Sequence, residues 1–596
     1  MFSKRLFWLE ILFLLIITIP LFSSLLSGYY FSMHDDQHIA RLFLLDQAIG
    51  QGDLYPRWVD TLGYSFGYPL FNFYPPLIYY VAEGFHLFGL SLIWSIKSTL
   101  ILGFALSVFG MHFFLRKRMG AIFSAVGATL YGYFTYHAVV VFIRGAFAEF
   151  FAMVLLPFAF LALESMAEKK TIKSAVVFAI CFALLILTHP LIAFPFIIFL
   201  GFYGLFHLLK NKKKIQTFVS YAWATLLGLV LSAFFWLPAM LERKFTQVDL
   251  LSTTDLSTYS LHYVCPSQFL YSAWGYGGSV PGCFDGLSFQ IGKVYLILLA
   301  LSLIGSVFYW IKRKKFDDAL LYYFFYFFLA VFSLFMTTNY SAFLWDNLKF
   351  LAYLQFPWRF LTYASFFITV SSIYSLFFWQ KILKHKHKEN IMGAVSVIVI
   401  VLTIFFYQKY FKPQTYVSLT DQQKTSFEEI AWNVSRTSLD FIPQGVPIKQ
   451  LNADRKTVDI DRSQLREDLY GVHLGTAKKV EVLKNKMNEK EFIVDAFVPL
   501  DFWLFTFNFP GWKAYLNEKE IPILTNESLN NIRVDIPQGY HNLKFVFENT
   551  PVRFVSNFIS LAGLLVTLYL LIGDKFKEVK RRLSARFNKS LNKSNW

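Results

Sequence analysis

Long apolar stretches separated by short polar segments make up most of the first 410 residues, and one more lies near the C-terminal end. A helix needs about 20 predominantly apolar residues to cross a bilayer, and most stretches are close to this length. The first follows Lys4 and Arg5 and has no small-residue cleavage site before Gly28, so we expect a retained anchor. We predict about twelve transmembrane helices, at residues 7–26, 98–115, 121–142, 148–166, 175–187, 192–209, 218–237, 294–311, 320–336, 360–378, 391–407 and 555–572.

A period of two replaces this pattern between residues 410 and 553. Alternating runs occur at 491–498 and 543–547, and turn-forming pairs occur at 510–511 and 538–539, which is typical of antiparallel strands. The predicted fold class is therefore a polytopic α-helical membrane protein with an extracytoplasmic β-sandwich-like domain. The predicted parts are a multi-spanning domain at residues 1–409 with outer loops at 28–97 and 242–293, a β-rich domain at 410–553, a final transmembrane helix at 554–573 and a basic cytoplasmic tail at 574–596.

Charge orients the chain. Only 16% of the residues are charged, against about 25% in soluble domains. The net charge of +17 does not indicate nucleic-acid binding, because the basic residues recur in short loops between the apolar stretches. Short loops rich in Lys and Arg are typical of the cytoplasmic side of membrane proteins. We therefore predict a multi-pass cell-membrane protein with both termini in the cytoplasm and no nucleic-acid partner. The basic clusters lie at residues 4–5, 116–118, 169–173, 210–214, 312–315, 381–388 and 575–593.

Two of the three cysteines, Cys265 and Cys283, share one polar loop that this topology places outside. A disulfide between them needs an oxidising compartment, which an outer loop meets. The alternative is a pair of free thiols.

Candidate chemistry begins directly after the first apolar stretch, where Asp35 and Asp36 stand between two histidines. A carboxylate there can act as the general base that takes the proton from a sugar or lipid hydroxyl. Both acids, together with His38, can also hold a divalent cation, Mg or Mn, which is the only cofactor that the sequence indicates. Alternatively, the acids cap the start of a helix and interact with its dipole.

Further ionisable residues are expected at the same outer depth. Arg57 is expected to face a lipid phosphate or an acid, and Arg144, Glu149, His189 and Arg359 lie at the predicted outer ends of helices. The arginines suit phosphate binding through forked hydrogen bonds, Glu149 can orient Arg144 or bind a metal, and His189 can act as a base or a ligand. The alternatives are an ion pair between Arg144 and Glu149, a histidine bonded to a backbone carbonyl, and an interfacial anchor at Arg359.

Together these residues resemble the GT-C glycosyltransferase superfamily and, more narrowly, the 6-pyruvoyl-tetrahydropterin synthase-related and YfhO-like membrane proteins. The resemblance implies a GT-C-like membrane domain in which a first-loop acid is the base or a metal ligand, a role that falls to Asp35 and Asp36. No zinc-binding histidine trio of a soluble pterin synthase is visible. The pieces that carry the resemblance are residues 34–36, 54–58, 71–76, 144–149, 188–190, 355–359, 509–513 and 537–541.

The function expected from this resemblance is transfer of a sugar from a polyprenyl-phosphate donor to an extracytoplasmic hydroxyl of a glycan, lipid or protein acceptor. Two alternatives stay open. One is a flippase or transporter of lipid-linked glycans, although the apolar stretches carry few charges away from their ends. The other is a non-catalytic membrane protein with an outer carbohydrate-binding domain.

Overall fold

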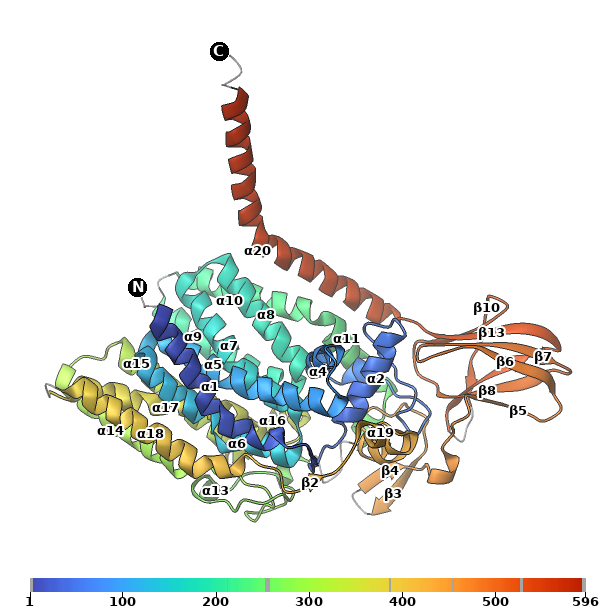
Figure 1. Cartoon of the computed structure of the whole chain (residues 1–596), viewed down its shortest axis with the longest axis horizontal. Coiled ribbons are helices and arrows are strands. Elements are labelled where there is room, and N and C mark those ends of the chain that lie inside the picture. Colours follow the sequence, from blue (N-terminus) through green and yellow to red (C-terminus); the bar gives the residue numbers. More distant parts are fainter. Residues whose placement is uncertain are drawn as a thin grey trace.

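Helices form a bundle at one end of the molecule and strands form a separate body at the other, as Figure 1 shows. The computed structural model describes residues 4–211, 213–251, 258–384, 387–452, 455–525 and 529–591. The long helices of the bundle are α1 (Lys4–Phe22), α5 (Leu92–Gly132), α7 (Phe147–Lys169), α8 (Ile172–Thr188), α9 (Pro190–Lys210), α10 (Lys214–Leu231), α14 (Lys293–Arg313), α15 (Asp318–Thr337), α17 (Leu361–Ile382), α18 (Lys388–Tyr407) and α20 (Pro551–Leu591).

Ten helices in the described part of the chain are long and apolar enough to cross a membrane, against the dozen predicted. The difference has two sources. Helix α8 is apolar but shorter than the others. Helix α5 contains two predicted spans that meet at Gly120, whose φ of 78° breaks the helix. The chain folds back there, and its two arms pack closely: a Cβ at Gly127 would meet Leu115, and a Cβ at Gly132 would meet Val108.

The second arm of this hairpin is itself interrupted, where the sequence predicts one continuous span over 121–142. Helix α5 ends at Gly132, Phe134 is extended, and the chain resumes as α6 (Thr135–Ala138) and a π-helical turn (Val139–Arg144). Every residue of this broken stretch is buried. A break at membrane depth is tolerated when protein surrounds it, because neighbouring groups then satisfy the freed backbone. The break brings Arg144 to the end of its helix.

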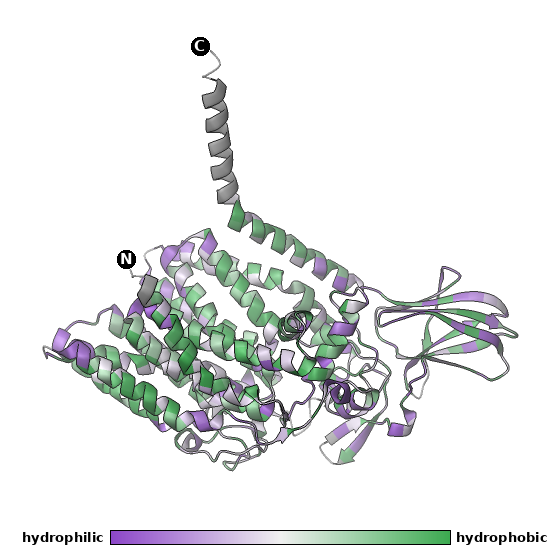
Figure 2. Cartoon of the chain, in the orientation of Figure 1, coloured by the Kyte–Doolittle hydropathy of each residue, from purple (hydrophilic) through white to green (hydrophobic). Residues whose placement is uncertain are grey.

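Shorter elements fill the side of the bundle that the sequence predicts to be the outer one, and the terms outer loop and outer domain refer to this predicted orientation. The strand β1 (Tyr30–Phe31) after the first span pairs antiparallel with β2 (Tyr416–Val417), which joins the first outer loop to the segment that follows α18. Hydrophilic residues gather in the strand-rich body and at the opposite ends of α14, α15 and α18, with apolar helices between them (Figure 2). The short helices are α2 (His38–Gly50), α3 (Leu70–Phe73), α4 (Leu77–Leu87), α11 (Ala233–Leu241), α12 (Val248–Leu251), α13 (Pro266–Leu270), α16 (Ala342–Asn347) and α19 (Asp421–Lys424).

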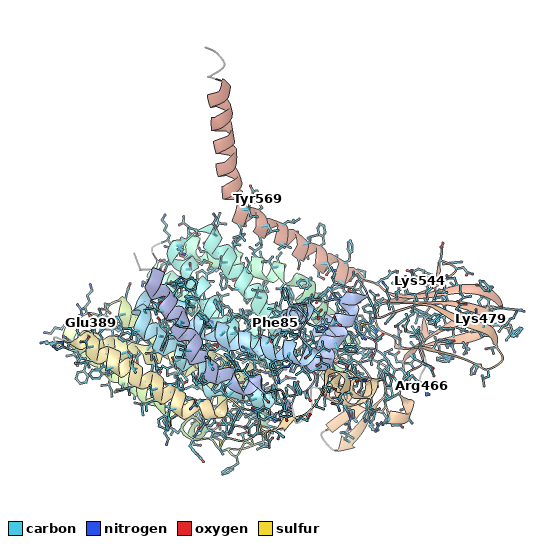
Figure 3. All side chains as sticks on the ribbon, viewed as in Figure 1. Phe85, Glu389, Arg466, Lys479, Lys544 and Tyr569 are labelled. Carbon is cyan, nitrogen blue, oxygen red and sulfur yellow. A yellow bond between two sulfur atoms is a disulfide. The ribbon has the colours of Figure 1, made fainter. Side chains whose placement is uncertain are left out.

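The outer domain is a sandwich of two antiparallel sheets, with strand orders β10-β9-β13-β7-β6 and β11-β12-β8-β5. The sheets meet through aromatic rings: Phe492 and Phe545 of one sheet pack on Phe502 of the other, with centroids 5.0 and 6.0 Å apart. Lys479 and Lys544 mark this body, far from Glu389 at the other end of the bundle (Figure 3). Its strands are β3 (Ile448–Asn452), β4 (Arg455–Val458), β5 (Tyr470–Val472), β6 (Ala477–Lys486), β7 (Glu489–Ala496), β8 (Leu500–Phe507), β9 (Trp512–Leu516), β10 (Lys519–Ile521), β11 (Leu524–Thr525), β12 (Asn531–Ile536) and β13 (Gly539–Phe547), of which β3 and β4 form a separate ribbon.

A buried ion pair fastens the sandwich to the bundle. The Arg553 side chain, 0% exposed, donates from Nε to the Glu242 carboxylate at 2.9 Å, and its Nη2 donates to the carbonyl of Pro510 at 2.8 Å. Glu242 also accepts hydrogen bonds from Asn72 at 2.9 Å and Thr550 at 2.6 Å. This carboxylate therefore links the first outer loop, the end of α11 and the last span.

We predict that Arg553→Ala destabilises the fold by about 3–5 kcal/mol, because it leaves the Glu242 charge buried without its partner. Urea unfolding of the purified protein in detergent measures the change. The matched control is Arg533→Ala, which removes a half-exposed pair with Asp501 at 3.6 Å and should cost less than about 1 kcal/mol. Equal effects of the two variants would contradict a fastening role for the buried pair.

The structure joins Cys265 and Cys283 in a disulfide, which closes the outer loop before α14. A crosslink of this sequence separation, 18 residues, restricts the unfolded chain. We predict that the double variant Cys265→Ser/Cys283→Ser lowers the free energy of unfolding by about 3 kcal/mol. Reductant should lower the stability of the unmodified chain and of Cys181→Ser, but not of the double variant. A chain that unfolds identically with and without reductant would refute this prediction.

Candidate active site

The first outer loop lies against the end of the broken helix. The backbone N–H of His34 donates to the carbonyl of Ile143 at 2.9 Å, and that of Asp35 donates to the carbonyl of Arg144 at 3.0 Å. Gly145 follows with φ 66°, and a Cβ there would lie 2.7 Å from Met33, so this close approach needs glycine. The sequence thus places Asp35 beside Arg144 through backbone contacts alone.

His38 stabilises the same contact between the first outer loop and Gly145. Its Nε2 lies 2.5 Å from the Gly145 carbonyl, its Nδ1 lies 3.0 Å from the Tyr79 hydroxyl, and its ring stacks on Phe147. Burial, and after it the nearby Arg41 guanidinium, lowers the pKa of His38 to about 3, so the imidazole is neutral and can donate one hydrogen bond and accept another. Both nitrogens are occupied within the protein.

A fully buried carboxylate, Glu149 in the first turn of α7, lies at the centre of the site. It accepts hydrogen bonds from Arg144 Nη1 at 2.7 Å and from the Tyr136 hydroxyl at 2.6 Å. Arg359 approaches it from the turn just before α17, with its Nε 3.9 Å from the carboxylate. Two arginines therefore share one acid, which leaves an excess of positive charge.

The guanidinium groups of Arg144 and Arg359 also have surroundings other than Glu149. The Arg144 guanidinium also lies over the Trp358 ring at 4.4 Å. Arg359 donates from Nη1 to the Leu354 carbonyl at 2.7 Å, and its buried Nε has no hydrogen-bond partner in the described residues. His189, at the junction of α8 and α9, interacts electrostatically with Glu149 and Arg359, and its buried Nδ1 also lacks a partner in the described residues. The structure thus brings four predicted residues together.

Asp35 and Asp36, adjacent in sequence, have different surroundings. Asp36 accepts hydrogen bonds from the Tyr30 hydroxyl at 3.2 Å and from Lys424 Nζ at 3.1 Å, and Lys424 also contacts Glu429. The Asp35 side chain is exposed, and its carboxylate has no hydrogen bond or ion pair within the described part of the chain. It interacts electrostatically with both arginines of the site. Asp36 thus joins the first outer loop to the segment that follows α18, residues 411–447, which we call the outer segment. The Asp35 carboxylate, in contrast, makes no hydrogen bond or ion pair with a described residue.

The outer segment contributes a carboxylate that the sequence did not reveal. Asp440 interacts electrostatically with Arg41, Asp35 and Arg359. Burial, and to a lesser degree Asp35, raises the pKa of Asp440, while Arg41 opposes this shift. Its side chain nonetheless reaches solvent. No motif surrounds Asp440 in the sequence, and only the fold places it opposite the first outer loop.

Two predicted roles need correction. Arg57 does not join the site: its guanidinium bonds to Asn72 at 3.0 Å, the Phe234 carbonyl at 2.7 Å and Asn557 at 3.0 Å, which makes it a structural crosslink. His38 is not placed as a metal ligand with the two aspartates, because both of its nitrogens are already bonded. Within the described residues, no three His, Cys, Asp or Glu side chains are grouped to hold a metal ion.

Residues 71–411, more than half of the chain, match the family described as the 6-pyruvoyl-tetrahydropterin synthase-related domain of membrane proteins. The chain belongs to this family. The match covers Arg144, Glu149, His189 and Arg359, while Asp35 and Asp36 precede it. The family predicted from the sequence is thereby confirmed. No curated protein matches the chain at a significant level.

Two solved structures are similar to this family member at low identity. The mycobacterial arabinofuranosyltransferase AftD is 10% identical, with a TM-score of 0.41 over 70% of this chain and 27% of that one. The oligosaccharyltransferase of Archaeoglobus fulgidus in its apo form is 12% identical, with a TM-score of 0.39 over 71% of this chain and 56% of that one. This chain thus spans about a quarter and about half of their respective lengths.

The different surroundings of the two aspartates predict different effects on stability. Asp36→Asn should lower the free energy of unfolding by about 1–2 kcal/mol, because buried Lys424 loses a charged partner. Asp35→Asn should change it by less than about 0.5 kcal/mol. Urea unfolding in detergent measures both. A larger loss for Asp35→Asn than for Asp36→Asn would contradict these assignments.

The Lys424 contact also predicts a pH dependence. Burial alone would lower the pKa of Lys424, but Asp36 and Glu429 outweigh it and raise that pKa above 10.5. Stabilisation from a raised lysine pKa is complete below the ordinary value and is lost as pH rises through the raised one. The stability difference between Asp36→Asn and the unmodified chain should therefore persist at neutral pH and shrink in strong alkali, where Lys424 loses its charge.

Proposed function

We propose that this protein is a membrane glycosyltransferase that moves a sugar from a polyprenyl-phosphate donor to the hydroxyl of an extracytoplasmic acceptor. The observation that carries the proposal is the exposed carboxylate of Asp35, which has no hydrogen bond or ion pair with a described residue and lies beside two arginines that share one buried acid, Glu149. A base and an anion site at one place are what such a transfer needs.

The donor phosphate would bind at Arg144 and Arg359. Guanidinium groups form charge-assisted, forked hydrogen bonds to phosphate, and Arg359 Nε has no hydrogen-bond partner in the described residues. Glu149 is a positioning residue in this scheme, because it holds both arginines without neutralising both. Negative charge grows on the leaving phosphate oxygen in the transition state, so preformed cations at this point lower the barrier.

Asp35 would act as the general base. It takes the proton of the acceptor hydroxyl as that oxygen forms its bond to the anomeric carbon. The bond from the anomeric carbon to the phosphate oxygen breaks, and its electron pair stays on the lipid phosphate. Direct displacement of this kind inverts the anomeric carbon. Asp440, which faces the same space from the outer segment, is available to orient the acceptor.

Transfer by the purified full chain in liposomes tests the proposal. Labelled polyprenyl-phosphate sugars would be offered with candidate acceptors, with and without Mg or Mn. We expect Asp35→Asn to lower transfer about 10²- to 10⁴-fold, the usual contribution of a general base. Asp46→Asn is the matched control, because this acid lies in α2 of the same first outer loop and its ion pair is with His86 at 3.8 Å.

Two outcomes would overturn the proposal. In the first, Asp35→Asn transfers sugar as fast as the unmodified chain. In the second, no donor is consumed under any metal condition while labelled lipid crosses the bilayer equally in all variants, which would favour a flippase.

A further inference from the structure

A second polar site lies at the other end of the bundle, away from the outer loops. Residues in and next to five helices, α5, α7, α9, α15 and α17, line an open cavity of about 480 Å³ there. Its wall includes Arg118 at the end of the first arm of α5, Lys170 directly after α7, and His207 and Lys210 in the last turn of α9. The basic loops predict that this end faces the cytoplasm.

The wall carries more positive than negative charge. Three cations, Arg118, Lys170 and Lys210, line the cavity with two acids, Glu168 and Asp318. Arg118 is paired with Glu164 at 3.0 Å and with Glu168 at 3.4 Å, Glu168 also pairs with Lys117, and Lys210 lies 2.9 Å from Asp318. Lys170 bonds to a neutral group, the side-chain oxygen of Asn211, at 3.3 Å. Among the described residues of the wall, Lys170 is therefore the cation without an acid partner.

Two of these cations, Arg118 and Lys210, lie close to the ring of Tyr322. The Arg118 guanidinium lies 4.0 Å and the Lys210 ammonium 4.3 Å from the centroid of Tyr322, which also lines the cavity. The ring therefore holds both cations at one part of the cavity wall.

Buried polar atoms without hydrogen-bond partners lie at and behind this wall. His207 is only 4% exposed, lines the cavity, and its Nε2 has no hydrogen-bond partner in the described part of the chain. The hydroxyl groups of Tyr203 and Tyr221, whose rings lie 6.3 Å from that of His207, also lack partners there. Buried polar groups are normally hydrogen-bonded, and of these three only His207 lines the cavity, so its ring nitrogen is the one that a bound group could reach.

We propose that this cavity binds a phosphodiester or phosphate monoester group, with Lys170, Arg118 and Lys210 balancing its charge and His207 Nε2 donating a hydrogen bond. A phosphodiester carries one negative charge, which matches the excess of one cation. Basic pockets between membrane helices at this depth suit the headgroups of anionic lipids. A soluble phosphate ester has the same binding chemistry. The site is independent of the sugar transfer proposed above.

The experiment is a binding titration of the purified full chain in detergent. The probes are short-chain phosphatidylglycerol, which is anionic, short-chain phosphatidylcholine, which is neutral overall, and inorganic phosphate. We expect phosphatidylglycerol to bind more tightly than phosphatidylcholine. Saturation by inorganic phosphate at similar concentration would identify a soluble phosphate as the ligand, whereas binding of phosphatidylglycerol alone would identify a lipid headgroup. Either result supports the proposal.

Variants locate the binding. Lys170→Gln and His207→Phe should each weaken binding about tenfold, the loss expected when one charge-assisted hydrogen bond is removed. Lys170→Arg should retain it, which separates loss of charge from loss of fold. Lys315→Gln is the matched control, an exposed lysine in the loop before α15. Equal binding of the two lipids, or unchanged binding in Lys170→Gln and His207→Phe, would overturn the proposal, as would failure of both phosphatidylglycerol and inorganic phosphate to bind.

Discussion

A carboxylate buried inside the bundle cannot stay charged unless cations and hydrogen-bond donors surround it. Glu149 is such a carboxylate, and the arrangement of the surrounding chain depends on it. Arg144, Tyr136 and Arg359 meet it from three different stretches of chain. Arg144 reaches the acid from a helix that breaks near Phe134 and ends at Gly145. The first outer loop packs against that glycine. The ion cluster and the irregular backbone around it thus occur at the same place.

The first outer loop and the outer segment complete the site on the side of the solvent. Asp36 and Lys424 join them by an ion pair, and β1 and β2 join them by a short sheet. Because these contacts occupy Asp36, the neighbouring Asp35 is left exposed beside the arginines. The Glu242 and Arg553 pair holds the sandwich at a separate point. The site is therefore assembled from the membrane part and the outer part together.

Much of this arrangement could be predicted from the sequence, because hydrophobic length and charge placement are local signals. Apolar runs located the helices, and the family residues located Arg144, Glu149, His189 and Arg359. The break after Gly132 was not predictable, since its residues are as apolar as their neighbours and only tertiary contacts favour it. Spacing also could not separate Asp35 from Asp36, nor remove Arg57 from the site, because their partners lie hundreds of residues away. Asp440 was missed for the same reason.

The most direct test of the central claim is an experimental structure of the full chain with a bound polyprenyl phosphate. We predict that the phosphate lies within hydrogen-bond distance of Arg144 or Arg359, on the side that Asp35 faces, with Glu149 still bonded to Arg144. A phosphate bound elsewhere, with both arginines still paired only to Glu149 and the protein backbone, would contradict the account.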